Sequence, residues 1–258
     1  MASRERGASE SRGLAVSVAG VRLALFLLAT AWALSGSAVA AEVLTLEATR
    51  DNTLFQDAEG DTSSGSGTSL FAGRNSQGLV RRTLVRFDVG AAWPDGAVLD
   101  SVTLHLHLSS SSDASPRAIR LHRVLADWGE GASSSAGGAG APAQEGDATW
   151  LHTFFPGSFW ASAGGDFTGL PSASTTVAGE GDYTWQGPGL IADVQAWLAQ
   201  GGDHGWIVIG DESVPGTARR FDSREYLTPE RRPWLSLHVS LATPAESRTW
   251  GGLKRQYR

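Results

Sequence analysis

The sequence predicts an all-β fold, an antiparallel jelly-roll β-sandwich with one short helix. Several segments alternate apolar and polar residues with a period of two, which is typical of strands that bury one face. Glycine is abundant, at 32 of 258 residues, and it separates these segments with turns. Only residues 190–199 show the apolar spacing of a convincing helix. Many short strands, glycine-rich turns and a single helix together indicate a sandwich.

The central stretch of the chain, residues 79–108, predicts two strands joined by a turn. Residues 102–108 alternate strictly between apolar and polar side chains, so one face of this strand is expected in the core. The first of the two strands has the bulky apolar residues Leu84, Phe87 and Val89. The residues between the two strands include Trp-Pro-Asp-Gly at 93–96, which favours a turn because proline presets φ and glycine accepts positive φ.

Further strands are expected on both sides of this hairpin. A first strand over residues 42–49 is expected to end at residues 51–53. Residues 56–68 are rich in glycine and serine, so they are expected to form a loop. Four more strands are expected at residues 70–73, 119–125, 206–209 and 234–241.

Two other segments have a different character. Residues 131–146 (GASSSAGGAGAPAQEG) have almost no side chain to bury, so they predict a mobile excursion from the sheet. Residues 190–199 place Ile191, Val194 and Leu198 on one face of a helix, which the glycine pair that follows is expected to stop.

The first 40 residues predict a cleaved secretory signal peptide. Arginines precede an apolar run at residues 23–34, and the Ala-Val-Ala at residues 38–40 matches the small-x-small pattern of a signal peptidase site. The run is shorter than the ~20 residues that span a bilayer. We therefore expect a mature chain without a membrane span, either secreted or held at the extracellular side of the cell envelope. An uncleaved N-terminal anchor is the alternative.

Charge and cysteine content narrow the classes of partner. Residues 1–40 carry four Arg and two Glu, so their removal changes the formal net charge from −6 to −8. An acidic protein of this kind is not expected to bind nucleic acid, because that affinity comes mainly from Lys and Arg on phosphates. The chain has no cysteine, so an exported form must be stabilised by packing and by any bound ion.

The sandwich domain is expected to cover residues 43–241, followed by a C-terminal tail at residues 242–258. The tail is basic, contains Thr249-Trp250-Gly251-Gly252-Leu253-Lys254 and has no strand pattern. A sorting or docking peptide and a frayed end are both consistent with this composition.

A series of sequence blocks resembles one family. The blocks run in the order DNTLF, SLFAG, RRTLVRFDV, LDSVTLHL, ADWGEG, GDATW, ADVQAWL, HGWIVIGDE and RRFDSRE. The most specific are residues 82–88, 127–130, 146–150 and 219–225. With these blocks the chain resembles the DNRLRE-type domain family of secreted bacterial proteins, which is similar to a group of carbohydrate-binding modules. The resemblance implies a jelly-roll sandwich that binds polysaccharide.

Catalytic motifs are missing from the sequence. It contains no G-x-S-x-G, no H-E-x-x-H, no phosphate-binding G-x-x-x-x-G-K-[ST] and no thiol. We therefore expect a non-catalytic module that binds an extracellular or cell-surface polysaccharide. The alternatives are a structural or adhesive envelope protein with a protein partner and, less favoured, a polysaccharide-cleaving enzyme that uses paired carboxylates.

The first acidic loop is a candidate calcium site. Asp57, Glu59 and Asp61 alternate in a glycine-rich segment, an arrangement in which carboxylate oxygens often bind calcium. The EF-hand pattern is not met, because the twelfth residue counted from Asp57 is Thr68. A solvated acidic turn is the favoured interpretation, and a structural Ca²⁺ here or near Asp51 is the alternative.

Aromatic and arginine side chains are the candidates for sugar contact. An indole or phenol face offers apolar area to the C–H face of a pyranose. The arginines of residues 219–225 either form an ion network with nearby carboxylates or bind an acidic sugar. For any single indole, packing of a loop onto the sandwich is the alternative role. The candidates are Trp128, Trp150, Trp160, Tyr183, Trp185, Arg220 and Arg224.

Overall fold

The computed structural model describes residues 39–242. Strands account for 43% of the structure and helices for 10%, and every strand pair is antiparallel, which confirms the predicted all-β sandwich class. The predicted signal peptide lies outside the described residues except for Val39 and Ala40, and the predicted tail except for Ala242. Signal cleavage and the role of the tail therefore stay predictions.

The strands, in chain order, are β1 (Val39–Glu47), β2 (Arg50–Phe55), β3 (Thr62–Ser63), β4 (Ser69–Arg74), β5 (Val80–Arg86), β6 (Ala97–Ser111), β7 (Arg117–Arg123), β8 (Ala141–Pro142), β9 (His152–Phe154), β10 (Ser158–Phe159), β11 (Ala173–Val177), β12 (Gly181–Gln186), β13 (Trp206–Ile209), β14 (Arg219–Asp222) and β15 (Trp234–Ala242). The helices are α1 (Val89–Ala92), α2 (Pro188–Gln200) and the 3₁₀ helix η1 (Pro229–Arg231).

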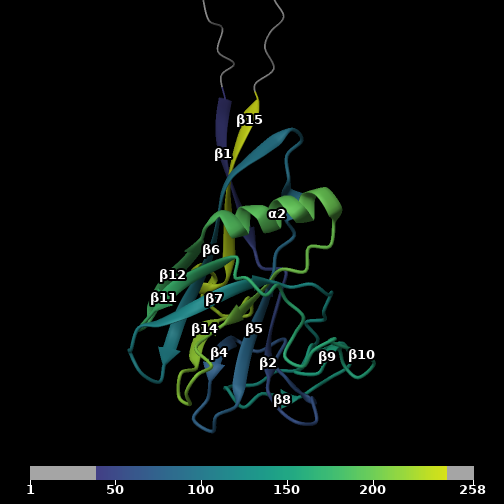
Figure 1. Cartoon of the computed structure of the whole chain (residues 1–258), viewed down its shortest axis with the longest axis vertical. Coiled ribbons are helices and arrows are strands. Elements are labelled where there is room, and N and C mark those ends of the chain that lie inside the picture. Colours follow the sequence, from purple (N-terminus) through teal and green to yellow (C-terminus); the bar gives the residue numbers. More distant parts are fainter. Residues whose placement is uncertain (1–38, 243–258) are drawn as a thin grey trace, which may run out of the picture. The chain divides into compact units, whose positions relative to one another are not determined.

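The main sheet curls into two layers. One layer contains β1, β15, β6, β12 and β14, and the other contains β2, β5, β13, β7 and β11. Strand β4 pairs with β14 on one side and with β5 on the other, so it joins the layers. Figure 1 shows α2 lying across the strands near one end, while the short strands β8, β9 and β10 gather toward the other.

Two hydrophobic clusters hold the layers and loops together. The larger lies between the layers and contains Leu104 and Leu237 from one and Trp206 and Val208 from the other. The smaller lies on the opposite face of the second layer, where loops cover it, and it contains Ile207. Because successive residues of β13 face different clusters, both its faces are buried, which explains its continuous apolar run.

Helix α2 forms where the sequence predicts it. Leu190, Val194 and Trp197 are buried and pack into the larger cluster. Gly201 ends the helix with a φ of 72°, a left-handed conformation that favours glycine. Within residues 39–242, neither α2 nor any other helix has the length and apolar character needed to cross a bilayer.

The predicted central hairpin is wrong. Its two strands exist as β5 and β6, but they lie in different layers, and β6 pairs with β12, β14 and β15. Helix α1 intervenes and redirects the chain, with Asp88 Oδ1 accepting a hydrogen bond from the N–H of Ala91 at its start. Residues 51–53, expected to end a strand, belong to β2.

Residues 131–146 are packed against the body rather than projecting as a mobile excursion. The N–H of Ser66 donates to the carbonyl of Ser133 over 2.8 Å, and the N–H of Ser135 donates to Ser64 Oγ over 3.1 Å. Ser133 is fully buried. Backbone and hydroxyl hydrogen bonds therefore hold this segment, although it has few apolar side chains to bury.

Candidate metal centre

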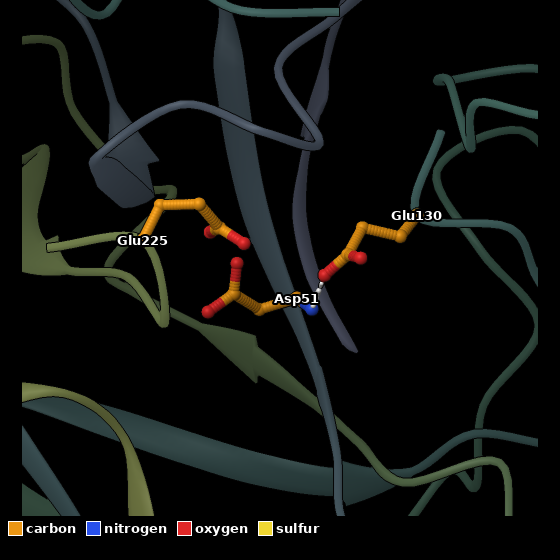
Figure 2. A group of neighbouring side chains, drawn as sticks. All are labelled: Asp51, Glu130 and Glu225. Carbon is orange, nitrogen blue, oxygen red and sulfur yellow. Dashed lines mark hydrogen bonds between the residues drawn. The ribbon is translucent and has the colours of Figure 1, made fainter. Parts of the chain in front are cut away.

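Three carboxylates converge where β2 meets two loops. Asp51 lies on β2, Glu130 follows β7, and Glu225 follows β14. One carboxylate oxygen of each residue lies within 4.8 Å of those of the other two. In Figure 2 the carboxylates of Asp51 and Glu225 point toward one another, while that of Glu130 reaches the backbone N of Asp51. No other three Asp, Glu, His or Cys side chains within residues 39–242 come as close.

Asn52, the neighbour of Asp51, anchors the loop that carries Glu130. Its Nδ2 donates to the carbonyls of Glu130 and Ala148, over 2.9 and 3.3 Å, and to Ser63 Oγ over 3.0 Å. Its Oδ1 accepts from the N–H of Ser64 over 3.3 Å. One buried amide therefore fixes the backbones of three loops around the carboxylates.

Close backbone contacts set the positions of the two glutamates. A Cβ at Gly65 would lie 1.7 Å from the carbonyl O of Glu130, so only glycine allows this approach. Ser223 Oγ donates to the carbonyl of Gly67 over 2.7 Å and accepts from the N–H of Glu225 over 3.1 Å. The loop after β14 is thereby attached to the loop before β4.

Arg224 neutralises only part of the negative charge. Its Nη1 donates to Glu130 Oε2 over 3.0 Å and to Glu225 Oε1 over 2.7 Å, and its backbone N–H donates to Asp51 Oδ2 over 2.7 Å. Two buried oxygens, Asp51 Oδ1 and Glu225 Oε2, have no hydrogen-bond partner among residues 39–242. A buried polar atom without a partner is costly, so a bound cation would relieve both.

Burial dominates the electrostatics of the cluster. The pKa of the Asp51 carboxyl is raised well above its usual range by burial and by the nearby charges of Glu225 and Glu130, although the Arg224 N–H lowers it. Burial also raises the pKa of Glu130. Although burial lowers the pKa of Arg224, the three carboxylates raise it overall. The cluster therefore destabilises its own charged form when no metal is bound.

The geometry fits a hard divalent cation. Calcium prefers oxygen ligands at about 2.3–2.6 Å, so two ligands on opposite sides of the ion lie about 4.6–5.2 Å apart. The spread of up to 4.8 Å among the three oxygens is compatible with this size. The smaller Mg²⁺ demands near-octahedral ligands at about 2.0–2.1 Å and usually keeps several waters, so sites made of protein ligands bind it less often. The buried acidic group could therefore hold a metal ion.

We expect the stabilisation by calcium to weaken as the pH falls. Because the folded-state pKa of Asp51 is raised, the metal-free protein gains stability from this group as the pH drops toward the ordinary carboxyl range. Calcium requires the deprotonated form and loses affinity over the same range. The difference in melting temperature between calcium-loaded and metal-free protein should be largest near about pH 7 and shrink toward about pH 5.

Thermal melts at a series of pH values, on protein stripped of metal before calcium is restored, measure this difference. Burial also raises the pKa of Asp203, to about 6. Because Asp203 titrates in both the calcium-loaded and the metal-free sample, its effect cancels in the difference between their melting temperatures. A calcium effect that is constant or grows toward pH 5 would contradict the assignment of Asp51 as a ligand.

No family model matches the chain, and none of the curated proteins is significantly similar to it. The resemblance to the DNRLRE-type family thus rests on its sequence blocks alone.

The structure corrects the expected metal ligands. Asp51 is part of the carboxylate cluster, but Asp57, Glu59 and Asp61 do not come together. Asp57 Oδ1 accepts a hydrogen bond from the N–H of Gly60, which uses that carboxylate to close a turn, while Glu59 and Asp61 are exposed. Carboxylates at alternate positions of one loop therefore do not come together around a common point here. Glu130 and Glu225 lie in two of the family-like blocks, yet nothing in their spacing from Asp51 predicts that they meet.

The four candidate indoles are core residues rather than sugar platforms. All four are buried, so their faces are covered by the protein itself. The Nε1 of Trp128 donates to the carbonyl of His204 over 2.8 Å, and the Nε1 of Trp185 donates to that of Ile119 over 2.9 Å. The expectation that Trp128, Trp150, Trp160 and Trp185 contact sugar is therefore wrong, because each packs a loop or a strand onto the sandwich.

The remaining candidates have three different environments. Tyr183 is half-buried, and its hydroxyl donates to the carbonyl of Gly179 over 2.7 Å, which closes the turn between β11 and β12. Arg224 belongs to the carboxylate cluster, as the ion-network interpretation predicts. Arg220 pairs with no carboxylate among residues 39–242, and its Nε donates to Ser109 Oγ over 3.2 Å. It lines an open cavity.

Proposed function

We propose that this chain is a secreted, non-catalytic β-sandwich of the DNRLRE type, which binds an extracellular or cell-surface polysaccharide and whose loops are held by one calcium ion. The calcium ion would be bound by Asp51, Glu130 and Glu225. It would have a structural role, because these residues join β2 to two loops that are distant in the sequence.

The burial of Asp51 is the observation that favours an ion over catalysis. Paired carboxylates about 5 Å apart are also the arrangement of a retaining glycosidase. A catalytic carboxylate must contact its substrate, however, and the exposed fraction of Asp51 is 0%. A bare cation can occupy a position that no sugar ring can reach. The cluster therefore supports a binding module with a structural ion rather than an enzyme.

An open groove beside β4 and β5 offers a surface for the polysaccharide. It consists of two cavities of 420 and 360 Å³ that share Asn75, Ser76, Arg81 and Gly138 in their walls. We call it the Arg81 groove. Phe71 on β4 forms part of its floor and is half-buried, so it retains some accessible ring area. Amide, hydroxyl and guanidinium groups beside an aromatic ring can bind sugar hydroxyls and ring faces.

Filling the groove should abolish binding without disturbing the core. A Cβ at Gly138 would lie 3.2 Å from the Phe71 ring, so the side chain of Gly138→Leu would fill the groove beside that ring. Gly157 has no atom within 4 Å of a built Cβ and is exposed elsewhere, so Gly157→Leu is the matched control. Affinity electrophoresis of the full-length chain through gels with neutral and acidic polysaccharides measures retention.

We expect at least one polymer to retard the wild-type chain and the Gly157→Leu variant but not the Gly138→Leu variant. The chain length of that polymer should stay the same after incubation with the protein. If no polymer retards the wild-type chain, polysaccharide binding is contradicted and a structural or adhesive role with a protein partner is favoured. If the polymer is shortened, the non-catalytic assignment is wrong.

A further inference from the structure

We infer that the Arg81 groove selects an anionic polysaccharide, with carboxylate or sulfate groups along its chain, and that Arg81 is the main determinant of this choice. The inference rests on the proposed polysaccharide-binding function and names the class of ligand.

Arg81 is a buried guanidinium without a counter-ion. Its exposed fraction is 4%, and within residues 39–242 no carboxylate forms an ion pair with it. Its Nε donates to the carbonyl of Gly138 over 3.1 Å, and its Nη1 donates to that of Val80 over 2.9 Å. No protein atom of the described residues accepts from Nη2. The guanidinium is thus held rigidly in the wall of both cavities with a donor to spare.

The surroundings of Arg81 make an external anion favourable. Its guanidinium carbon lies 4.9 Å from the centre of the Phe55 ring, so one face of the group is covered by an apolar surface. Burial lowers the pKa of Arg81, and the nearby charge of Asp57 only partly opposes this. A carboxylate or sulfate oxygen from a ligand would supply the missing charge in a place shielded from water.

Two more arginines line the same groove, and neither has a carboxylate partner among residues 39–242. Arg74 on β4 and Arg220 on β14 are half-buried in the wall of the 360 Å³ cavity. Within the described part of the chain, the Nε of Arg74 is buried without a hydrogen-bond partner, and the guanidinium of Arg220 forms hydrogen bonds to Ser109 alone. Arg74, Arg81 and Arg220 together give the groove three positive charges against one carboxylate, that of Asp57.

This local excess is not a general property of the protein. Several other half-buried or buried arginines pair with carboxylates, for example Arg82 with Glu212 at 2.8 Å and Arg219 with Asp113 at 3.0 Å. The whole chain carries a formal net charge of −6, so a polyanion is repelled by most of the surface. Binding of a polyanion by this protein therefore requires a dedicated site such as the groove.

The experiment compares charged polymers with uncharged polymers of the same sugar backbone. Isothermal titration of the full-length chain would use polygalacturonate and its fully methyl-esterified form for carboxylate, and dextran sulfate and dextran for sulfate. Arg81→Met keeps most of the apolar contact with Phe55 and removes the charge. Because Arg81 is buried and its loss can affect folding, Arg74→Gln and Arg220→Gln provide a second test at less buried positions. Arg120→Gln, an exposed arginine outside the groove, is the matched control.

We expect the charged member of at least one pair to bind and its neutral partner not to bind. Affinity should fall about tenfold or more in Arg81→Met and less in the Arg74 and Arg220 variants, because charged hydrogen bonds are the strongest class. It should be unchanged in Arg120→Gln and weaken with added salt. Equal binding of charged and neutral partners, or full affinity in all three groove variants, would overturn the inference while leaving polysaccharide binding intact. Absence of binding to all four polymers would overturn the inference, and if no polysaccharide in the gel experiment retards the chain either, the proposed function itself is contradicted.

Discussion

Replacing Trp128 by alanine should lower the free energy of unfolding by about 3–5 kcal/mol, the usual cost of removing a buried Trp or Phe side chain. The indole is fully buried in the smaller hydrophobic cluster and lies in the loop that carries Glu130. Its loss would leave a cavity and would also leave the His204 carbonyl without its 2.8 Å hydrogen bond. A loss of this size is a large fraction of the ~5–15 kcal/mol that stabilises a typical domain.

Urea unfolding followed by tryptophan fluorescence and far-UV circular dichroism would measure this change. Phe159→Ala is the matched control, because that ring is 63% exposed and its removal should change stability by less than ~1 kcal/mol. If Trp128→Ala kept its stability and instead lost polysaccharide binding, the indole would be a surface contact and our account of this cluster would be wrong.

Replacing Asp51 by asparagine should change stability in opposite directions with and without calcium. In metal-free protein the substitution removes a buried charge that is repelled by Glu225 and Glu130, while the amide oxygen can still accept from the Arg224 N–H. The variant should then be as stable as the wild type or more stable. In calcium the wild type should gain about 2.7 kcal/mol at a hundredfold excess over Kd, or about 5–10 °C in melting temperature, and the variant should gain almost nothing.

Differential scanning fluorimetry of both proteins, with calcium and after chelation, provides the four melting temperatures needed. Glu59→Gln is the matched carboxylate-to-amide control in an exposed position, and it should keep the full calcium response. A variant that is less stable than the wild type by the same amount with and without calcium would indicate that Asp51 serves the ion network with Arg224 rather than a cation.

The strands that could be predicted from the sequence are those whose side chains alternate or are uniformly apolar. Strands β13 and β15 match their predicted ranges closely because burial of one or both faces leaves a periodic pattern. Strand β2 was not predicted, since Asp51 and Asn52 are residue types depleted in strands. These residues are nevertheless fully buried, and the side chain of Asn52 binds the surrounding loops.

The packing of residues 131–146 could not be inferred from composition. A sequence without apolar side chains is expected to stay mobile, because it buries too little surface to offset the entropy of ordering. Here, hydrogen bonds to the glycine- and serine-rich loop before β4 compensate, as between Ser135 and Ser64. Residues 56–68 and residues 131–146 are each expected to form a loop, and hydrogen bonds between them order both. The composition of either segment alone does not indicate this.

The candidate site was only partly accessible to sequence reasoning. Asp51 was a candidate position for a calcium ion, but its partners Glu130 and Glu225 come from loops after β7 and β14. Only the curl of the sheet brings these loops together. The indoles were expected to be exposed and to contact sugar, but they are buried. A large aromatic residue in a loop has the same sequence signature whether it faces solvent or the core.

Isothermal titration of calcium into the metal-free full-length chain, repeated with Asp51→Asn, tests the central claim most directly. We predict one calcium ion per wild-type chain, much weaker binding of magnesium, and loss of the calcium site in the variant. Absence of calcium binding to the wild type, or binding that persists unchanged in Asp51→Asn, would contradict the assignment of Asp51, Glu130 and Glu225 as a calcium centre.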